Sequence, residues 1–313
     1  MKEITVFSGT AHPELAAEIC HHLEVPLSPS KVMRFANDCL EVQLESNCRE
    51  RDVFIIQPLV APVQEHLVEA LLMLDAARGA SASRITLVMP FYAYSRSDKK
   101  DAPRISIGGR LVADLLVTAG ANRVLTMAMH SPQVHGFFSI PVDHLHALHE
   151  LAGHFRNYDL SNAVAVSPDL GNAKDTAAFA RLLKVPMAVA AKQRISDHEV
   201  RIGPVIGEVT GKDVIVLDDE IARGTTTIEL LQRLREHNVK SVRIACTHGL
   251  FAAGAAQRLS DQPDVAEIVC TNTVPVPPEK RGSKLTVLSI ARPLAEAMRR
   301  IHDGESVSAL FHA

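Results

Sequence analysis

Several features that are common in other protein classes are missing from this chain of 313 residues. No apolar run approaches the roughly 18 residues that span a bilayer, and the N-terminus lacks the pattern of a signal peptide. The five cysteines are scattered, odd in number and free of any Cys-x-x-Cys spacing, so neither a disulfide framework nor a zinc site is indicated. We therefore expect a soluble protein of the reducing cytoplasm with no membrane partner.

A strong charge bias is also missing. Lys and Arg number 33 against 36 Asp and Glu, they are spread along the chain, and the net charge is −3. Because no basic stripe could neutralise a polyphosphate backbone, we expect no nucleic-acid partner. A content of 47% hydrophobic and 22% charged residues is typical of a globular enzyme, and the length suits two domains of about 150 residues.

The chain does contain a regular alternation of strand-like and helix-like segments. Short β-branched runs recur throughout, and apolar residues at helical spacing lie between many of them, as in the segment 63–72. This alternation predicts an α/β fold in which mainly parallel sheets are flanked by helices. Strands are predicted at 4–7, 53–56, 85–89, 124–127, 164–167, 187–190, 214–217, 242–246 and 268–270.

The two halves of the chain also resemble each other. Residues 121–130 align without gaps with residues 239–248, and each segment reads as a strand that ends in His. Together with the length, this match predicts two α/β domains related by internal duplication, 1–150 and 151–313. The join is expected near 150–160, and the last residues of the chain are candidates for packing on the first domain.

The most informative segment is 215–232, in which an apolar run is followed by Asp218-Asp219, a loop rich in Gly and Thr, and a helix-like stretch. It reads as strand, acidic turn, loop and helix start. In an open α/β sheet, ligands bind beyond the carboxyl ends of the strands, and a loop that opens a helix offers N–H groups and hydroxyls to an anion. We predict a sugar phosphate with its hydroxyls on the two acids, which would also suit a metal. A solvated turn is the alternative for this segment taken alone.

Further polar side chains follow other predicted strands. The segment 94–101 combines cations with acids and could hold a polyphosphate with its Mg²⁺. His130 and Asp169 could share a divalent ion whose remaining ligands are waters and substrate phosphates. Lys192 and Arg194 could cover the oxygens of a transferring phosphoryl group. Taken singly, each segment is equally compatible with a solvated loop or a packed histidine.

In their order along the chain, these segments resemble the ribose-phosphate pyrophosphokinase family, also called phosphoribosyl diphosphate (PRPP) synthetases. The similarity covers essentially the whole chain and is carried by residues 7–9, 13–16, 34–37, 96–101, 130–133, 136–138, 167–169, 192, 194, 218–219 and 305–308. It implies two phosphoribosyltransferase-like (type I) domains. It also implies transfer of the diphosphoryl group of Mg-ATP to the C1 hydroxyl of ribose 5-phosphate, which yields PRPP and AMP for nucleotide biosynthesis.

The resemblance assigns roles to particular residues. Those implied in ATP binding are Arg96, Ser97, Asp101 and, from a neighbouring subunit, Phe35 and Asn37. Those implied in holding Mg²⁺ are His130 and Asp169, and the implied catalytic residues are His130, Lys192 and Arg194. Those implied in binding ribose 5-phosphate are Asp218, Asp219, Ala222, Arg223, Gly224, Thr225 and Thr226.

The chain departs from the family pattern at the sugar-phosphate loop. Ala222 and Arg223 stand where family members typically carry Asp-Thr, although Gly224 and Thr226 remain and the loop length is unchanged. This departure leaves open a diphosphokinase for another C5-substituted ribose, or a catalytically silent homologue that regulates an active partner. A nucleobase phosphoribosyltransferase needs only one such domain and no ATP segment, so the duplicated chain argues against it.

The resemblance also implies partners beyond the two substrates. Because Phe35 and Asn37 bind ATP in the family only across subunits, it implies a homo-oligomer, by analogy a hexamer. Control by phosphate or ADP is left open, because His135 and His144 replace the Gln and Asn that are frequent at the family's regulatory site. The residues of this chain that fall at that site are Arg49, Asp143, Ser306 and Ser308.

Overall fold

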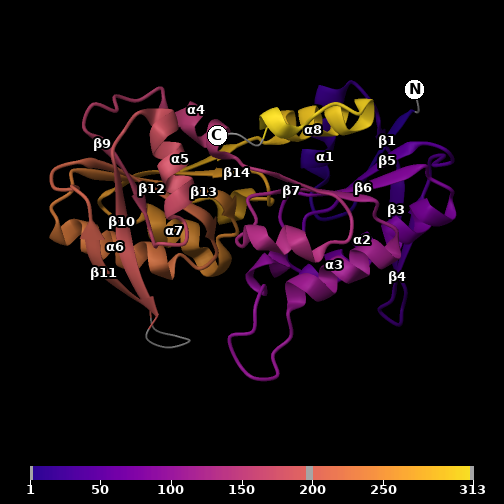
Figure 1. Cartoon of the computed structure of the whole chain (residues 1–313), viewed down its shortest axis with the longest axis horizontal. Helices are drawn as coiled ribbons and strands as arrows, with labels where there is room; N and C mark the ends of the chain where they lie inside the picture. The colour runs from indigo at the N-terminus through magenta and orange to yellow at the C-terminus, as the bar shows by residue number, and fades with distance from the viewer. Residues whose placement is uncertain (1–2, 195–199, 311–313) are drawn as a thin grey trace. The chain divides into compact units, whose positions relative to one another are not determined.

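A computed structural model describes residues 3–194 and 200–310, and it describes only the backbone of residues 192–194, 200–202 and 309. The chain divides into two compact units, each built on a mainly parallel sheet (Figure 1). The first unit runs to His146 and is taken up again at Ser289, and the second unit is Ala147–Leu288. The α/β fold class predicted from the alternating segments is confirmed.

The first unit has a six-stranded sheet in the order β2-β1-β5-β6-β7-β8, and all of its strands are parallel. Helices α1 and α8 lie on one face of this sheet, and α2 and α3 lie on the other (Figure 1). A separate antiparallel hairpin is formed by β3 and β4. The elements are β1 (Ile4–Ser8), α1 (Pro13–Leu23), β2 (Leu27–Ser28), β3 (Ser30–Arg34), β4 (Leu40–Leu44), β5 (Asp52–Ile56), α2 (Val63–Gly79), β6 (Arg84–Met89), α3 (Gly108–Ala119), β7 (Arg123–Met127), β8 (Val142–Leu145) and α8 (Ala291–Asp303).

The second unit has a seven-stranded sheet in the order β11-β10-β9-β12-β13-β14-β15. The sequence of strand β12 is almost continuously apolar up to Leu217 because both faces of the strand are buried. Val214 and Val216 point into the core with α6 and α7, whereas Ile215 and Leu217 point into the opposite core with α4 and α5. The elements are α4 (Leu148–Phe155), β9 (Ala163–Ser167), α5 (Ala173–Leu183), β10 (Met187–Arg194), β11 (Val200–Ile206), β12 (Asp213–Ile221), α6 (Thr225–Glu236), β13 (Ser241–Gly249), α7 (Ala255–Ser260), β14 (Val265–Thr271) and β15 (Leu285–Leu288).

All nine predicted strands are confirmed, and the structure adds six more within the residues that it describes. The sequence did not indicate β2, β3, β4, β8, β11 or β15. Strands β2 and β8 have only two and four residues, and β3 and β4 alternate partly buried with exposed positions instead of forming an apolar run. A buried parallel strand carries a strong apolar signal, whereas a short or solvent-facing strand does not.

The two sheets repeat one topology. Matched along the chain, the order β2-β1-β5-β6-β7-β8 corresponds to β10-β9-β12-β13-β14-β15, which supports the predicted duplication. The gapless match of residues 121–130 with 239–248 was nevertheless wrong, because it joins β7 to β13. The shared order pairs β7 with β14 and β6 with β13. Buried parallel strands have similar apolar sequences, so a ten-residue match cannot distinguish neighbouring strands.

Polar contacts with Asp52 and Arg84 tie the C-terminal helix α8 to the first unit. Asp52, which is only 3% exposed at its side chain, accepts a bond from Arg84 Nε at 2.8 Å and lies 2.8 Å from His302 Nδ1. Arg84 Nη2 also donates to the carbonyl of Ile301 at 2.8 Å. The predicted boundary lay after residue 150, whereas the structure divides the chain after His146 and again after Leu288.

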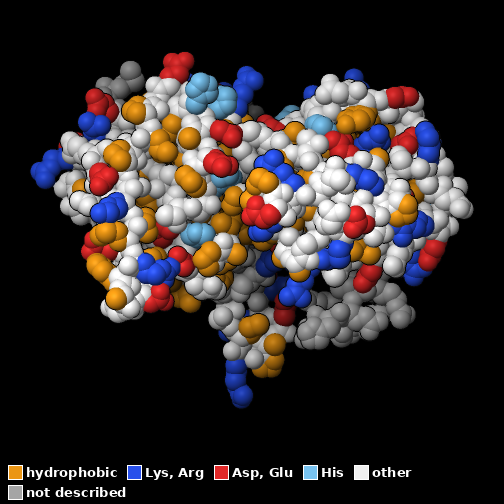
Figure 2. Space-filling model, turned by 180° about the vertical axis from the view of Figure 1, so that it is seen from behind, with side chains coloured by type: hydrophobic (Ala, Val, Ile, Leu, Met, Phe, Trp, Pro, Cys, Tyr) orange, Lys and Arg blue, Asp and Glu red, His pale blue; other side chains and the backbone are white. Residues whose placement is uncertain are grey.

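Three further features concern the helices, the cysteines and the surface charge. Among the helices that the structure describes, none is long and apolar enough to cross a membrane. All five cysteines are free thiols, and only Cys39 is exposed. On the face shown in Figure 2, the described basic and acidic side chains are interspersed over both units.

Candidate functional site

Two acidic residues lie inside strand β12, near its carboxyl end. Asp218 is opposite Cys246 of β13, and pairing between the two strands continues to Ile221 opposite Gly249. The predicted acidic turn is therefore corrected: Asp218 and Asp219 are strand residues. The ladder with β13 holds the acids in an extended backbone, so the turn begins only after Ile221.

A third carboxylate comes from the neighbouring strand. Strands β9 and β12 are parallel and in register up to Val166 opposite Val216, so the residues that follow them meet at the same end of the sheet. Burial, the adjacent Asp219 and the carboxylate of Asp169 together raise the pKa of Asp218 well above its ordinary value. The ionised form of such a carboxylate is stabilised by a cation or by hydroxyl donors. Two vicinal hydroxyls of a sugar would supply such donors.

The turn that carries Asp169 is fixed by short hydrogen bonds. Ser167 Oγ donates to the carbonyl of Asp169 at 2.6 Å, and Asp169 Oδ1 accepts the N–H of Asn172 at 3.0 Å. Asn172 Nδ2 in turn donates to the carbonyl of Leu217 at 2.6 Å, directly before the paired acids. The role of Asn172 was not predicted, because only the fold places it beside β12.

The loop from Ala222 to Gly224 connects these acids to helix α6. Gly224 has a left-handed backbone, with φ 70°, and precedes a helix start that has no side-chain cap and no acid in its first turn. The first N–H groups of a helix lack partners inside the helix, and the helix dipole favours an anion there. Arg223 and Thr225 are exposed beside this start. The predicted phosphate loop thus offers donors and positive charge, with no carboxylate between Ile221 and Thr227.

The segment predicted to bind ATP forms a closed loop in the first unit. Ser97 closes its base, because Ser97 Oγ accepts the N–H of Gly108 at 2.8 Å and the Ser97 carbonyl accepts that of Gly109 at 2.9 Å. Arg96 and Asp101 are exposed, and Lys99 Nζ lies 3.6 Å from Asp101 Oδ1. Ser97 therefore has a structural role in addition to the predicted one.

A hydrogen bond joins this loop to the turn that carries His130. Ser131 Oγ donates to Asp98 Oδ2 at 2.7 Å, and the N–H of Met129 donates to His144 Nε2 at 2.9 Å. Ala128 at the start of the turn has φ 44°, a strained value for a residue with a side chain. His130 itself is exposed. Asp98 and His144 were not predicted to position this turn, and no local sequence signal indicates it.

Phe35 and Asn37 lie at the tip of the hairpin β3–β4. The N–H of Phe35 donates to the Cys39 carbonyl at 2.9 Å, and that of Asp38 donates to the Phe35 carbonyl at 2.9 Å, which closes the turn. The Phe35 side chain is 47% exposed. An exposed aromatic ring on a hairpin tip is available to another molecule, which is compatible with a role outside its own chain.

Some of the predicted site residues are not brought together in the part of the chain that the structure describes. His130 lies in the first unit and Asp169 in the second, so their shared metal site stays a prediction. Lys192 and Arg194 belong to β10, opposite residues 202 and 200 of β11, and their side chains lie outside the described ones. Among the described residues, no three His, Cys, Asp or Glu side chains are arranged to hold a metal by themselves.

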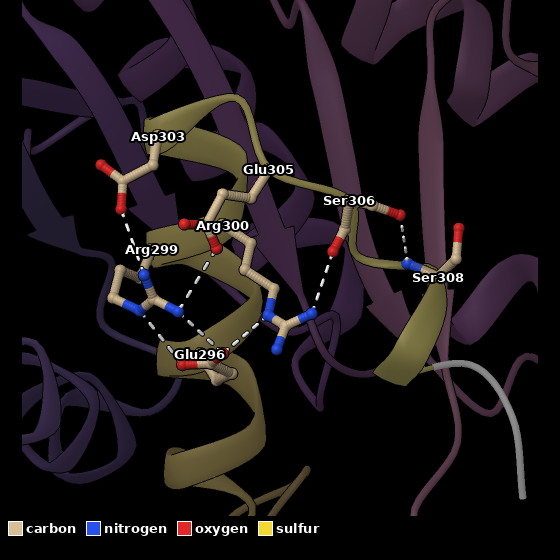
Figure 3. Close-up of polar contacts among 7 residues, drawn as sticks. All are labelled: Glu296, Arg299, Arg300, Asp303, Glu305, Ser306 and Ser308. Carbon is tan, nitrogen blue, oxygen red and sulfur yellow. Dashed lines mark hydrogen bonds and ion pairs between the residues drawn. The ribbon is translucent and has the colours of Figure 1, made fainter.

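The residues at the possible regulatory site have partners within the first unit. Asp143 is buried in an ion pair, with its Oδ2 2.5 Å from Arg123 Nη1. Ser306 follows α8, and its carbonyl accepts a bond from Arg300 Nη1 at 3.0 Å (Figure 3). The N–H of Ser308 donates to Ser306 Oγ at 3.2 Å. These contacts order the chain after α8 and leave the regulatory role untested.

The same helix end carries a group of charged residues (Figure 3). Hydrogen bonds from Arg299 and Arg300 lower the pKa of Glu296 to about 2. Arg299 also lies 3.3 Å from Asp303 and 3.5 Å from Glu305. Each cation therefore already has acidic partners, so the group holds the helix end together instead of presenting free charge to a ligand.

Comparison with known proteins decides the family. A model of the N-terminal domain of ribose phosphate pyrophosphokinase matches residues 4–120, and a model of the phosphoribosyl synthetase-associated domain matches residues 195–312. The chain belongs to the ribose-phosphate pyrophosphokinase family. A ribose-phosphate pyrophosphokinase of Deinococcus radiodurans is 48% identical over 98% of both chains. A Streptomyces coelicolor protein that carries the same name provisionally is 72% identical over 100% of this chain and 99% of that protein.

A solved structure of the same family confirms the fold. The phosphoribosylpyrophosphate synthetase from Mycobacterium smegmatis superposes with a TM-score of 0.91 at 40% identity, covering 97% of this chain and 100% of that one. The predicted family, the two-domain phosphoribosyltransferase-like fold and the enzyme class, a pyrophosphokinase, are therefore confirmed. The roles of individual residues at the site stay predictions.

Proposed function

We propose that this ribose-phosphate pyrophosphokinase family member is an active enzyme that makes PRPP and AMP from ribose 5-phosphate and Mg-ATP in the cytoplasm. The observation that carries the proposal is the carboxyl end of the second sheet, where paired acids precede an uncapped helix start. Membership of the family indicates that the substrate bound by this arrangement is ribose 5-phosphate. The acids suit the ribose hydroxyls, and the helix start suits the 5-phosphate.

The sugar is held at its two ends. Asp218 and Asp219 accept hydrogen bonds from the ribose hydroxyls, and Gly224, Thr225 and Thr226 hold the phosphate through N–H and hydroxyl donors. The raised pKa of Asp218 supports this arrangement, because hydroxyl donors stabilise the crowded carboxylates that burial and repulsion destabilise. Two anchoring points fix the direction of the C1 hydroxyl, which is the reacting group.

The reaction joins the C1 oxygen of the sugar to the β-phosphorus of ATP. The bond from the β-phosphorus to the oxygen bridging it to the α-phosphorus breaks, AMP leaves, and the C1 hydroxyl loses its proton. Phosphoryl transfer of this kind requires mainly positioning and neutralisation of charge between two anionic substrates. We assign neutralisation to Lys192 and Arg194, and positioning of the ATP phosphates to the turn of His130.

Carboxylate oxygens and an imidazole, completed by substrate phosphates, form a suitable donor set for Mg²⁺. The crowding of Asp218, Asp219 and Asp169 is the feature of the structure that fits a cation near the sugar. We assign His130 and Asp169 as the residues that contribute to holding the ion. When bound, Mg²⁺ neutralises phosphate charge and orients the polyphosphate for in-line transfer.

The first unit is assigned the nucleotide. Arg96, Ser97 and Asp101 supply its own contacts, and Phe35 and Asn37 supply contacts to the nucleotide of a neighbouring copy. An exposed apolar surface supports a homo-oligomer, for which a hexamer is the expected form: Leu111 is 49% exposed and Leu115 39% exposed, four residues apart on α3. Phosphate or ADP control remains part of this proposal.

The test is phosphorus NMR of the purified protein with Mg-ATP and ribose 5-phosphate. The expected result is AMP that appears in step with a sugar diphosphate. Hydrolysis of ATP without a sugar product, or no reaction at all, would contradict the proposal. Repeating the assay with other C5-substituted riboses would then separate a changed sugar specificity from a catalytically silent protein.

A further inference from the structure

Arg258 of helix α7 joins the backbone of two loops that lie far apart in sequence. Its Nη2 donates to the carbonyl of Arg223 at 2.6 Å, and its Nη1 donates to the carbonyl of Ala253. The first carbonyl belongs to the sugar-phosphate loop, and the second belongs to the loop that follows β13. No sequence motif points to Arg258.

The segment 251–258 binds three consecutive carbonyls at the sugar-phosphate loop. The carbonyls of Ile221 and Ala222 accept the N–H groups of Phe251 at 3.1 Å and of Ala252 at 2.8 Å. Arg258 takes the third carbonyl, that of Arg223. The next one, of Gly224, accepts the N–H of Ile228 at 2.9 Å as the first bond of α6. Four consecutive carbonyls thus accept hydrogen bonds from within the protein, and the donors to three of them belong to the segment 251–258.

That segment has an unusual backbone. Phe251 has φ 44° and Ala253 has φ 52°, both in the left-handed region, which costs energy for residues other than glycine. A buried Phe251 ring fixes the first of them, since a Cβ at Gly249 would lie 2.4 Å from that ring. The bond from Arg258 fixes the carbonyl of the second. Strain of this kind persists only where the surroundings impose it.

The other side of the loop rests on α7. Gly224 has φ 70°, and a Cβ there would lie 3.3 Å from Leu259 and 3.5 Å from Ala255. Helix α7 therefore supports the loop by packing through Leu259 and by hydrogen bonding through Arg258. With its carbonyls bound and its glycine packed, the loop has little freedom to turn the N–H groups of Thr225 and Thr226 away from an anion.

We propose that Arg258 is a positioning residue for the phosphate group of the sugar substrate, a role that rests on the proposed function of the loop. It touches neither substrate. It fixes the Arg223 carbonyl, and through it the direction of the donors at the start of α6 and of the Arg223 side chain. Its loss is expected to weaken sugar binding and to leave the chemical step and nucleotide binding largely unchanged.

The test compares Arg258→Ala with the wild-type protein. We expect the KM for ribose 5-phosphate to rise about tenfold, because the loop must then be ordered by the ligand itself, while kcat and the KM for ATP change by less than about threefold. Calorimetric binding of ribose 5-phosphate is expected to weaken by the same factor. Arg258→Lys, which keeps one charged donor, is expected to recover part of the loss.

Arg156→Ala is the matched control. Arg156 also belongs to the second unit and also donates to a backbone carbonyl, that of Leu182 at 3.3 Å, but it is exposed at the end of α4, whereas Arg258 is half-buried. An Arg258→Ala protein with an unchanged KM for the sugar would overturn the inference, as would an equal loss in the Arg156→Ala control. If Arg258→Ala does not fold, Arg258→Gln takes its place under the same criteria.

The outcomes separate this inference from the proposed function. A wild-type protein that binds ribose 5-phosphate without turnover refutes the proposed function, and the binding measurement still tests Arg258. A wild-type protein that makes PRPP, with a variant indistinguishable from it, refutes the inference alone. A wild-type protein that neither binds nor converts the sugar refutes both.

Discussion

At the carboxyl end of the first sheet, the loop after β1 binds the protein's own side chains, whereas the matching place in the second sheet holds crowded acids. Thr10 donates both its N–H and its hydroxyl to the Glu69 carboxylate, each at 2.6 Å. The N–H of Ala11 donates to Gln57 Oε1 at 3.1 Å. Gln57 is fully buried and Glu69 is 1% exposed.

Because the two sheets share one topology, the ends of their strands can be compared residue by residue. Phe7 of β1 is opposite Ile55 of β5, so Gln57 lies two residues beyond that pair. In the second sheet, Val166 is opposite Val216, which places Asp218 two residues beyond that pair, at the position equivalent to Gln57. A neutral amide with internal partners therefore stands where the second unit has a carboxylate of raised pKa.

The difference shows how a duplicated fold can keep one site and close the other. Gly9 approaches Gln57 so closely that a Cβ would lie 2.2 Å from its Oε1. The first unit thus uses its loop donors for stability, and Glu69 occupies the place that an anionic ligand would need. In the second unit, the corresponding acids repel one another until a ligand or cation arrives. Stability and ligand binding are alternative uses of the same loop.

The largest expected effect comes from Asp218→Asn. We expect turnover to fall on the order of 10²–10³, the size typical for removing one preorganised electrostatic contact, because the amide no longer matches the ribose hydroxyls. The ligand-free protein should instead become more stable, since a carboxylate with a raised pKa destabilises the folded state when it is ionised. Steady-state kinetics and thermal unfolding measure the two effects.

Asp159→Asn is the control for that variant. Asp159 is exposed in the same unit, and its Oδ1 accepts the N–H of Ser161 at 2.9 Å, a bond that an asparagine can replace. Its turnover and unfolding temperature should stay close to the wild-type values. An Asp218→Asn protein that loses stability as well as activity would show that the acid is structural.

The opposite pattern is expected for Glu69→Ala in the first unit. Loss of the buried carboxylate removes two hydrogen bonds to Thr10 and should lower the free energy of unfolding by about 2 kcal/mol. The KM for the sugar should not change, because the proposed sugar site lies in the second unit. Urea denaturation measures the first effect and steady-state kinetics the second.

Glu65→Ala supplies the comparison on the same helix. Glu65 pairs with Arg34 at the surface, where an ion pair contributes about 1 kcal/mol or less. Equal stability losses for the two variants would mean that Glu69 does not close the loop. A sugar KM that rises only in Glu69→Ala would place a substrate contact in the first unit and break the comparison.

A third prediction concerns pH. Because the folded state raises the pKa of Asp218, its contribution to stability is fully present below the ordinary aspartate pKa and is lost as the pH rises through the raised value. The unfolding temperature of Asp218→Asn should therefore exceed that of the wild type most at high pH. The difference should shrink on acidification toward about pH 4, the ordinary range for aspartate. A difference that does not depend on pH would show that the carboxylate is not destabilised by its surroundings.

The smallest expected effect is that of Arg223→Ala. An exposed cation beside the phosphate contributes about 1 kcal/mol at most, so the KM for ribose 5-phosphate should rise about threefold to fivefold at low salt. The effect should diminish as ionic strength increases. Arg233→Ala, which loses a surface pair with Glu236 on α6, should show no change in the sugar KM. A salt-independent effect would point to a packing role for Arg223.

Part of the candidate site is readable from the sequence because its residues are local. Asp218, Asp219 and the loop to Thr226 form one continuous segment, and their order alone indicated a sugar phosphate. The residues that were missed act from a distance in sequence: Arg258 reaches a carbonyl 35 residues away, and Asn172 reaches one 45 residues away. Neither has a neighbouring motif that would reveal its partner.

The amino-acid sequence by itself determined the alternation of strands and helices, the family, and the acidic segment with the glycine- and threonine-rich loop that follows it. These features depend on the apolar pattern and the residue types within short segments, so they can be predicted without knowing which distant residues lie nearby. Only the tertiary structure decided that the acids lie within β12, that α8 returns to Asp52 and Arg84, and that Glu69 closes the first loop. Strand register and side-chain pairing depend on packing between distant segments, whose energies no local pattern encodes.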